Sequence, residues 1–406
     1  MTTLIKMIPC LLWLTFTLQG CTLIKNDELD NAPTMSKNEF NADVDLLKQQ
    51  FNPVVLSDGQ RKLIVVPELQ GRIMTATANA TKGQTFGWFN HDYLQTPHQS
   101  RSTPIGGADR LMFGPETGTF SQFFPHGKER TTDNLYAQDA IVMQPYNVIA
   151  QTASKITVQA PVTLVNNADT TFEFDVKRTV RLFSKAEIEA MTKLTHLDTV
   201  EFVGYGSDTQ IINTGEAWKK ETGLVSIWHL GAFKPSADTT VVIPTKGTVK
   251  EATPYFNAIK TSHTQTAKNH VFYKADAQYM NKTGVPPHQT KPIMGAYDAQ
   301  RNLLTLVMFN ISKHQAARYV TASWIDSSDP YNGEIVNVFN DGPDDFGQYF
   351  GPFYEMESSS AAFELSSGGS QSHYHYTLHF QGDKTALNKI TTELLGITLS
   401  EIEQVF

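Results

Sequence analysis

The sequence predicts an all-β fold, and three observations lead to that class. Apolar and polar residues alternate along 172–182, which is typical of a strand with one buried face. Turn-forming Gly, Asp and Pro recur along the whole chain, whereas helical spacing is confined to its two ends. Hydrophobic residues make up 40% of the chain and charged residues only 18%, so most of the chain should bury a core rather than stay disordered.

Each expected element follows from its own local pattern. Strands are expected at 63–66, 72–77, 156–158, 172–182 and 303–309. In 172–182 every even position except Arg178 is apolar: Phe172, Phe174, Val176, Val180 and Leu182. A short helix is expected at 40–51, another between Asp383 as N-cap and Gly396 as stop, and a last turn from Ser400 to the terminus.

A single large domain is expected over 37–406. The 406 residues would suffice for two or three domains of average size. No linker rich in Pro or Ser divides the body, however, and no repeat of fixed period indicates a propeller or a solenoid.

The N-terminus has the pattern of a secretory signal followed by a lipid anchor. Lys6 supplies a positive charge, and residues 8–18 form an apolar stretch too short to span a membrane comfortably. The stretch ends in Leu-Gln-Gly-Cys at 18–21, which looks like a bacterial lipobox in which Cys21 is lipidated. We therefore expect a signal peptide at 1–20 and a lipidated tether at 21–36. An ordinary signal peptide with an incidental cysteine is the alternative.

By resemblance to known lipoproteins, Thr22 after the cysteine favours the outer membrane, with the protein facing the periplasm or the cell exterior. Cys10 and Cys21 are the only two cysteines, so the mature chain would hold no disulfide. The net charge of −8 would repel a nucleic-acid backbone, so nucleic acid is not an expected partner. We expect no cofactor.

Three motifs carry a family resemblance. They are Gly-Gly-Ala-Asp-Arg-Leu-Met-Phe-Gly-Pro-Glu at 106–116, Ser-Ile-Trp-His-Leu-Gly at 226–231, and Pro-Phe-Tyr-Glu-Met-Glu-Ser-Ser-Ser at 352–360. Together they resemble uncharacterised bacterial lipoproteins and secreted proteins of the galactose-mutarotase-like (aldose epimerase-like) group. This resemblance implies a β-supersandwich, in which large antiparallel sheets stack face to face and a concave face binds sugar.

The resemblance also implies catalytic residues. Glu355 matches the base of aldose epimerases, and Glu357 stands where they carry a Gln. Two positions apart on a strand, both carboxyl groups point to one face, where mutual repulsion would raise at least one pKa. The alternative is that one Glu pairs with Arg72 or Arg110 and only holds the sheet face together.

The acid partner is less well defined. His126, in Pro-His-Gly at 125–127, and His229 are the candidates for protonating the sugar ring oxygen. Further candidate substrate-binding residues are Arg72, Asp109, Arg110, Glu116, Trp228 and Tyr354, although Asp109 and Arg110 would equally fix their loop by pairing. Aromatic residues that either stack on a sugar or fill the core are Trp88, Trp228, Trp324, Tyr331, Tyr349, Phe350 and Tyr354.

A late strand places three histidines on one face. His373, His375 and His379 hold odd positions, and the even positions between them are aromatic or aliphatic. Such a face is a weak candidate for zinc if a third ligand arrives, or a neutral hydrogen-bonding face. Three functions remain open: a carbohydrate-acting envelope enzyme, a non-catalytic glycan-binding lipoprotein, and a structural envelope lipoprotein.

Overall fold

The computed structural model of the protein describes residues 38–96, 104–249, 253–255, 258–321, 329–343 and 349–406. Residues 37–406 form one compact unit. The expected signal peptide, Cys21, the tether at 21–36 and Trp324 lie outside the described residues. Among the helices of the described part, none is long and apolar enough to cross a membrane.

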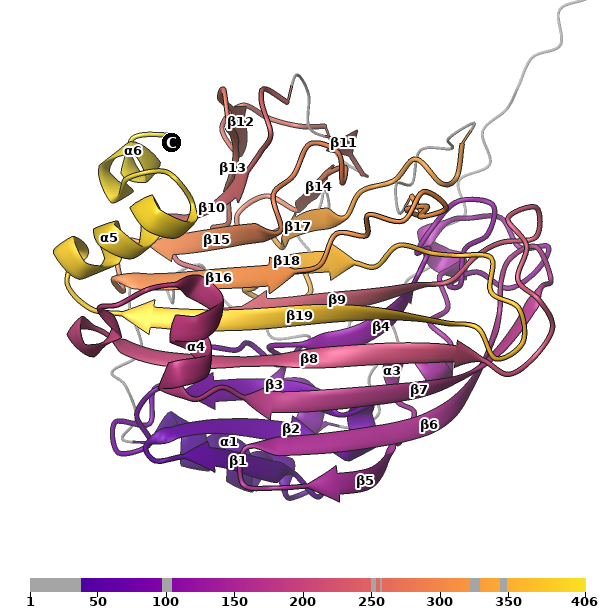
Figure 1. The fold of residues 1–406 in the computed structure, drawn as a ribbon, viewed down its shortest axis with the longest axis horizontal. Helices are drawn as coiled ribbons and strands as arrows, with labels where there is room; N and C mark the ends of the chain where they lie inside the picture. Colours follow the sequence, from indigo (N-terminus) through magenta and orange to yellow (C-terminus); the bar gives the residue numbers. More distant parts are fainter. Residues whose placement is uncertain (1–37, 97–103, 250–252, 256–257, 322–328, 344–348) are drawn as a thin grey trace, which may run out of the picture. The chain divides into compact units, whose positions relative to one another are not determined.

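The larger of the two main sheets has ten antiparallel strands, seen face-on in Figure 1. Their order across the sheet is β12-β13-β10-β15-β16-β19-β8-β7-β6-β5. The bounds are β5 Asn147–Gln151, β6 Lys155–Val165, β7 Thr171–Leu182, β8 Glu201–Asn213, β10 Thr239–Pro244, β12 Thr264–Thr266, β13 His270–Lys274, β15 Ile293–Asp298, β16 Leu303–Phe309 and β19 Ser370–Gln381.

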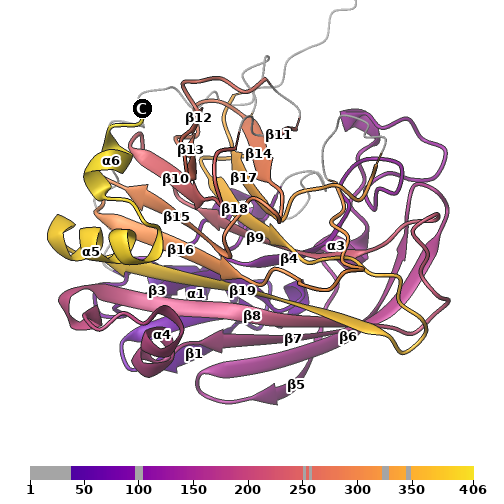
Figure 2. The ribbon, with the colours of Figure 1, turned by 45° about the horizontal axis from the view of Figure 1, so that its top comes forward.

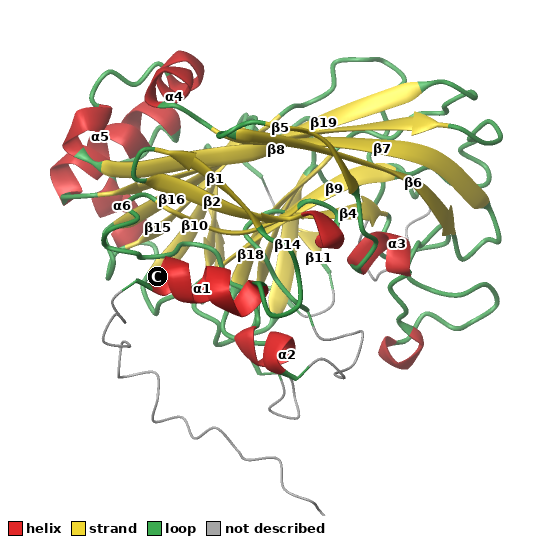
Figure 3. Cartoon of the chain, turned by 90° about the horizontal axis from the view of Figure 1, so that it is seen from below, coloured by secondary structure: helices red, strands yellow, loops and turns green. Residues whose placement is uncertain are grey.

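The second main sheet has six antiparallel strands in the order β11-β14-β17-β18-β9-β4. Its strands are β4 Arg110–Gly114, β9 Ser226–Phe233, β11 Thr253–Pro254, β14 Asn281–Val285, β17 Val336–Asn340 and β18 Tyr354–Ser359. A smaller sheet contains β1 Val54–Asp58, β2 Arg61–Val66 and β3 Arg72–Thr77. Figure 2 shows β17, β18, β9 and β4 following one another beyond β19, and Figure 3 shows the two main sheets as separate layers.

The predicted all-β class with large antiparallel sheets is confirmed. The expected strands are found as β2, β3, β6, β7 and β16. The alternation in β7 has the predicted meaning, because its even positions are buried and its odd positions lie at the surface or near it. Arg178, the exception, also points inward and is fully buried, because Asp109 provides an ionic partner between the sheets.

Helices lie mainly on the outer surfaces of the sheets. They are α1 Glu39–Leu47, α2 His91–Gln95, α3 Asp139–Val142, α4 Lys185–Thr192, α5 Lys384–Leu394 and α6 Leu399–Glu403, with 3-10 turns at Pro67–Leu69, Thr132–Asn134 and Leu197–Thr199. Ile188 of α4 and Leu387 and Ile390 of α5 share an apolar cluster with Leu378 and Phe380 of β19. In this way α4 and α5 cover the face of the ten-stranded sheet that points away from the six-stranded one.

The predicted terminal helices are confirmed as α1, α5 and α6, and Asp383 caps α5 by accepting from the backbone N–H of Ala386 at 2.8 Å. The expectation that only the ends of the chain are helical is wrong. Helix α4 begins with a capping box, in which the Ser184 hydroxyl accepts from the N–H of Glu187 and the Glu187 carboxylate accepts from the N–H of Ser184. This Ser-x-x-Glu pattern was a readable signal for a helix in mid-chain.

Candidate functional site

Strand β18 presents alternate side chains to opposite sides of the six-stranded sheet. Tyr354 and Met356 belong to the apolar core, and Ser358 hydrogen-bonds to histidines of β19. Glu355 and Glu357 therefore point the other way, to the outer face of the six-stranded sheet. The two glutamates share one face, as their spacing predicts.

Four carboxyl groups and two cations gather on this outer face, and we call them the carboxylate cluster: Glu116, Asp341, Glu355 and Glu357 with Arg110 and Lys282. Arg110 of β4 donates from Nη2 to Oε1 of Glu355 at 2.9 Å. The ammonium of Lys282, on β14, lies 2.9 Å from Oε2 of Glu357 and 3.5 Å from Oε2 of Glu116. Strands β4, β14 and β18 thus supply most of the cluster, and Asp341 follows β17 directly.

Burial disfavours the charged form of these carboxyl groups. It raises the pKa of Glu357 to about 7, against the opposing attraction of Lys282 and with further repulsion from Glu355. Burial also raises the pKa of Asp341 to about 7. It raises the pKa of Glu355 as well, although the positive charges of Arg110 and Lys282 act to lower it. Carboxyl groups in this range can donate and accept protons near neutral pH.

Lys282 behaves differently from its neighbours. Burial lowers its pKa, but the negative charges of Glu357, Glu116 and Glu355 outweigh that effect, so the pKa is raised. Its ammonium also lies 4.6 Å from the centre of the Trp228 ring and 5.3 Å from that of Tyr255. The cluster therefore stabilises a buried positive charge.

Part of the cluster is accessible to solvent. The side chain of Glu116 is 25% exposed, that of Arg110 13% and that of Glu355 8%, whereas Glu357 is fully buried. Oε2 of Glu357 accepts from Lys282 and from Nε1 of Trp228, the latter at 2.9 Å. Its second oxygen, Oε1, is buried and has no hydrogen-bond partner among the described residues.

Aromatic rings border the cluster. Trp88 stacks on Phe353 with ring centroids 4.2 Å apart, and both pack on Phe339, the register partner of Glu355. The carboxylate of Asp341 accepts from the backbone N–H of Phe350 at 3.4 Å and of Gly351 at 2.6 Å. Tyr349 and Phe350 therefore lie next to the cluster, and their side chains are largely exposed.

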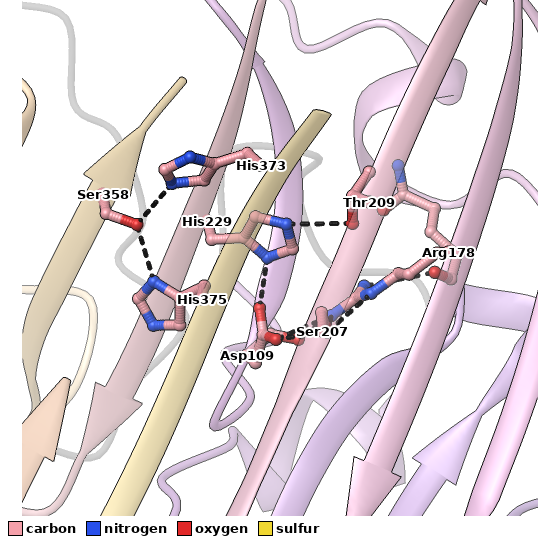
Figure 4. A network of polar contacts seen from close by, with 9 residues as sticks. Asp109, Arg178, Ser207, Thr209, His229, Ser358, His373 and His375 are labelled. Atoms are coloured by element: carbon pink, nitrogen blue, oxygen red, sulfur yellow. Dashed lines mark hydrogen bonds and ion pairs between the residues drawn. The ribbon is translucent and has the colours of Figure 1, made fainter. Parts of the chain in front are cut away.

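A second polar group, which we call the interior network, lies between the two main sheets: Asp109 and His229 on the side of the six-stranded sheet, and Arg178, Ser207 and Thr209 from β7 and β8 of the ten-stranded sheet (Figure 4). Nδ1 of His229 lies 2.6 Å from Oδ1 of Asp109, and its Nε2 lies 3.1 Å from the hydroxyl of Thr209. The guanidinium of Arg178 lies 3.1 Å from Oδ2 of Asp109. Burial opposes the charge on Asp109, but His229 and Arg178 hold its pKa well below the usual range.

The three histidines of β19 continue this inner layer. The hydroxyl of Ser358 lies 2.8 Å from Nε2 of His373 and 2.9 Å from Nδ1 of His375. His379 contacts Thr305 and Tyr205, each at 2.9 Å. Burial lowers the pKa of His375 and of His379 to about 3, and lowers that of His373 well below its usual value, so all three rings are neutral at pH 7.

The histidine face therefore points between the sheets and hydrogen-bonds there. In the described part of the chain, His, Cys, Asp and Glu residues form no group of three or more that is placed to hold a metal ion.

The structure brings together five of the candidate site residues: Arg110, Glu116, Trp228, Glu355 and Glu357. The ion pair between Glu355 and Arg110 matches the alternative stated above, in which a glutamate pairs with an arginine and holds the sheet face together. The terminal nitrogens of Arg72 are engaged elsewhere, since they donate to the backbone carbonyls of Gly106 and Val142 at 3.0 and 2.9 Å, although Arg72 is close enough to Arg110 for the two charges to repel.

Among the described residues, neither expected acid partner contacts Glu355, which corrects that expectation. His126 is exposed, and its Nδ1 lies 3.1 Å from the carbonyl of Asn167. His229 is the register partner of Ser358, so it shares the inner face with Ser358, on the opposite side of the sheet from Glu355. Asp109 and Tyr354 also point to the inner side and cannot line the same site as Glu355.

Lys282 and Asp341 were not singled out by sequence reasoning as site residues. Lys282 stands in the short segment Asn281–Val285, which has no alternation that marks a strand, and its burial is evident only in the structure. Asp341 stands in the acidic turn at 340–345, of which 344 and 345 lie outside the described residues.

The fold and site define a two-layer antiparallel β-protein with a carboxylate cluster on the outer face of its smaller main sheet. The chain belongs to a family of unknown function (DUF6786), whose model matches residues 38–406. A comparison with curated proteins found no match.

Solved structures similar to the chain include a putative aldose 1-epimerase from Escherichia coli K12, with 11% identity over 82% of this chain and 100% of that chain, at a TM-score of 0.49. A galactose mutarotase-like protein from Clostridium acetobutylicum has 13% identity over 82% and 96% of the two chains, also at 0.49. A putative mutarotase from Salmonella typhimurium has 9% identity over 82% and 92%, at 0.44. These proteins carry the names of the group that the sequence motifs resemble.

Proposed function

We propose that the carboxylate cluster binds a carbohydrate and that Glu355, with Glu357, supplies acid–base chemistry to it. The observation that carries this proposal is the pair of neighbouring glutamates, both with raised pKa values, on a face that solvent reaches at Glu116, Arg110 and Glu355. Of the aromatic residues bordering the cluster, Tyr349 and Phe350 are exposed, and their rings suit the apolar C–H faces of a sugar.

The reaction that fits such groups is the interconversion of sugar anomers. A base removes the proton of the anomeric hydroxyl while an acid protonates the ring oxygen, and the bond between the anomeric carbon and the ring oxygen breaks. The open aldehyde rotates, and the same steps in reverse close the ring. The ionised form of Glu355 is favoured by Arg110, so Glu355 is the base, and a protonated Glu357 or Asp341 serves as the acid.

A second candidate function is glycan binding without turnover. It is favoured by the positions of His126 and His229, which the described structure does not bring to Glu355. A structural envelope lipoprotein would use the cluster neither to bind a carbohydrate nor to catalyse a reaction.

Calorimetry against a panel of mono- and oligosaccharides tests these alternatives, with Glu355→Gln as the matched variant. The expected result is heat of binding with at least one saccharide and its loss in the variant. Polarimetry then separates the first two functions, since only the enzyme speeds anomer interconversion above the buffer rate. An absence of heat with every saccharide would overturn both proposals and leave the structural role.

We further propose that the chain is exported and anchored in the outer membrane through acyl chains on Cys21. The lipobox-like 18–21 motif and the polar stretch at 22–36 support this proposal. Mass spectrometry of the mature N-terminus should find an acylated Cys21, and Cys21→Ser should release the protein from the membrane fraction. A mature protein with an unmodified Cys21 would contradict the proposal.

A further inference from the structure

We infer that the carboxylate cluster selects a saccharide bearing a protonated amine, an amino sugar, over neutral and acidic sugars. This inference rests on the proposed carbohydrate-binding function and names the class of ligand that the same face would take.

The first argument is the balance of charge on this face. Four carboxyl groups, Glu116, Asp341, Glu355 and Glu357, face two cations. Arg110 is paired with Glu355, and Lys282 with Glu357 and Glu116. A carboxylate or phosphate on a ligand would meet cations that are already matched and would add to the repulsion among the acids. A positive charge on the ligand would relieve that repulsion and favour the ionised forms of Glu357 and Asp341, whose pKa values are otherwise raised to about 7.

The second argument is a buried acceptor that needs a donor. Oε1 of Glu357 is buried without a hydrogen-bond partner among the described residues, while Oε2 of the same group is bound by Lys282 and Trp228. An unpartnered buried oxygen of this kind destabilises the protein. Because Glu357 has no exposed surface, a ligand donor restores the lost interaction only once the neighbouring side chains move. An ammonium carries three N–H donors, and its hydrogen bonds to a carboxylate are stronger than those of a neutral hydroxyl.

The third argument is that the face already holds one ammonium. Lys282 is almost fully buried, yet its pKa is raised because three glutamates surround it. The rings of Trp228 and Tyr255 add to the stabilisation of positive charge at this place. The same surroundings would favour the charged form of an amine on a bound sugar.

Calorimetry with the full-length protein and four probes tests the inference: glucosamine, N-acetylglucosamine, glucose and glucuronate. N-acetylation removes the charge from an otherwise identical sugar. We expect glucosamine to bind about tenfold more tightly than N-acetylglucosamine or glucose, and glucuronate to bind most weakly. The preference for the amine should weaken in high salt, because Glu116 is partly exposed and salt screens its attraction for the ammonium.

Glu116→Gln and Glu357→Gln are the test variants, and Glu189→Gln on α4 is the matched control. Glu116 is partly exposed and its replacement should fold normally, which a thermal melt can verify. Glu189 pairs only with the surface residue Lys185 at 3.6 Å in the described structure, so its replacement should leave the preference unchanged. We expect Glu116→Gln to reduce the glucosamine preference roughly threefold.

The outcomes separate the two proposals. Binding of glucose or N-acetylglucosamine as tightly as glucosamine overturns the inference and leaves carbohydrate binding intact. A glucosamine preference that survives both Glu116→Gln and Glu357→Gln also overturns it. A lack of heat with all four probes and with the wider saccharide panel overturns the proposed function itself.

Discussion

The two faces of the six-stranded sheet carry polar groups of opposite character. On the inner face, Asp109 is ionised between Arg178 and His229, and every partner is buried. On the outer face, Glu355 and Glu357 have raised pKa values, and one oxygen of Glu357 is unpartnered. Strand β18 contributes to both faces through adjacent residues. The difference indicates that the inner group joins the sheets, whereas the outer group keeps an unpartnered carboxyl oxygen next to the proposed ligand site.

The two faces also respond to pH with opposite signs. The inner histidines have lowered pKa values, so the unfolded chain binds more protons than the folded one below pH 6.5, and stability falls with falling pH. The outer Glu357 and Asp341 have pKa values raised from about 4.5 and 3.8 to about 7, so the folded chain binds more protons in that range. Their contribution is present at low pH and is lost as pH rises toward 7.

The largest expected effect is acid unfolding driven by the inner face. His375 and His379 have pKa values of about 3 in the folded state. Each should therefore lower the free energy of unfolding by several kcal/mol between pH 6.5 and pH 3.5, because each pKa unit corresponds to about 1.4 kcal/mol. Urea denaturation across this range measures the loss. His379→Gln should flatten the acid limb relative to the natural chain, and an unchanged slope would contradict the assignment.

The next effect in size is the removal of Arg178. Its guanidinium is fully buried against Asp109, so Arg178→Met should lower the free energy of unfolding by about 3–5 kcal/mol, because a buried carboxylate then keeps only part of its pairing. Urea denaturation at pH 7 measures this. The double variant Arg178→Met with Asp109→Asn should recover part of the loss, and a loss below about 1 kcal/mol in the single variant would refute the contrast between the faces.

Removing Lys282 should have a smaller effect, and one that depends on pH. At pH 5 a Glu357 without its cation is protonated and neutral, so Lys282→Met should destabilise the protein by about 1 kcal/mol or less. At pH 8 the same carboxyl group must either ionise unpaired or take up a proton, so the loss should exceed that at pH 5 by about 1–2 kcal/mol. Equal losses at the two pH values would show that Glu357 does not titrate in this range.

The smallest effect on stability is expected at the rim of the outer face. Tyr349 is 51% exposed, so Tyr349→Ala should change the free energy of unfolding by less than about 0.5 kcal/mol. If its ring contacts the ligand, saccharide binding should weaken several-fold in calorimetry. Val148→Ala, at a side chain 44% exposed on the edge strand β5 of the ten-stranded sheet, is the control and should leave binding unchanged.

Sequence periodicity predicted the strands well because alternation reports one buried face, and the single break at Arg178 marked a buried charge. It also placed Glu355 and Glu357 on one face. Periodicity does not show which face lies inside, so His229 and Tyr354 were assigned to the wrong side of the sheet for Glu355. Asp109 and Arg110 are adjacent in an extended segment, and this adjacency alone implies opposite directions.

The partners of Glu355 and Glu357 were harder to predict. Lys282 comes from β14 and Arg110 from β4, and both are far from β18 in sequence. Their contacts depend on strand order and register, which local patterns do not specify.

The hydroxyl of Ser358 has one hydrogen, yet it lies within bonding distance of a ring nitrogen of both His373 and His375. It can donate to only one of these neutral rings, and the other ring must donate to it. If Ser358 donates to His373, that ring carries its hydrogen on Nδ1, and so does His375; if Ser358 donates to His375, both rings carry it on Nε2. One serine proton therefore sets the tautomers of two imidazoles together.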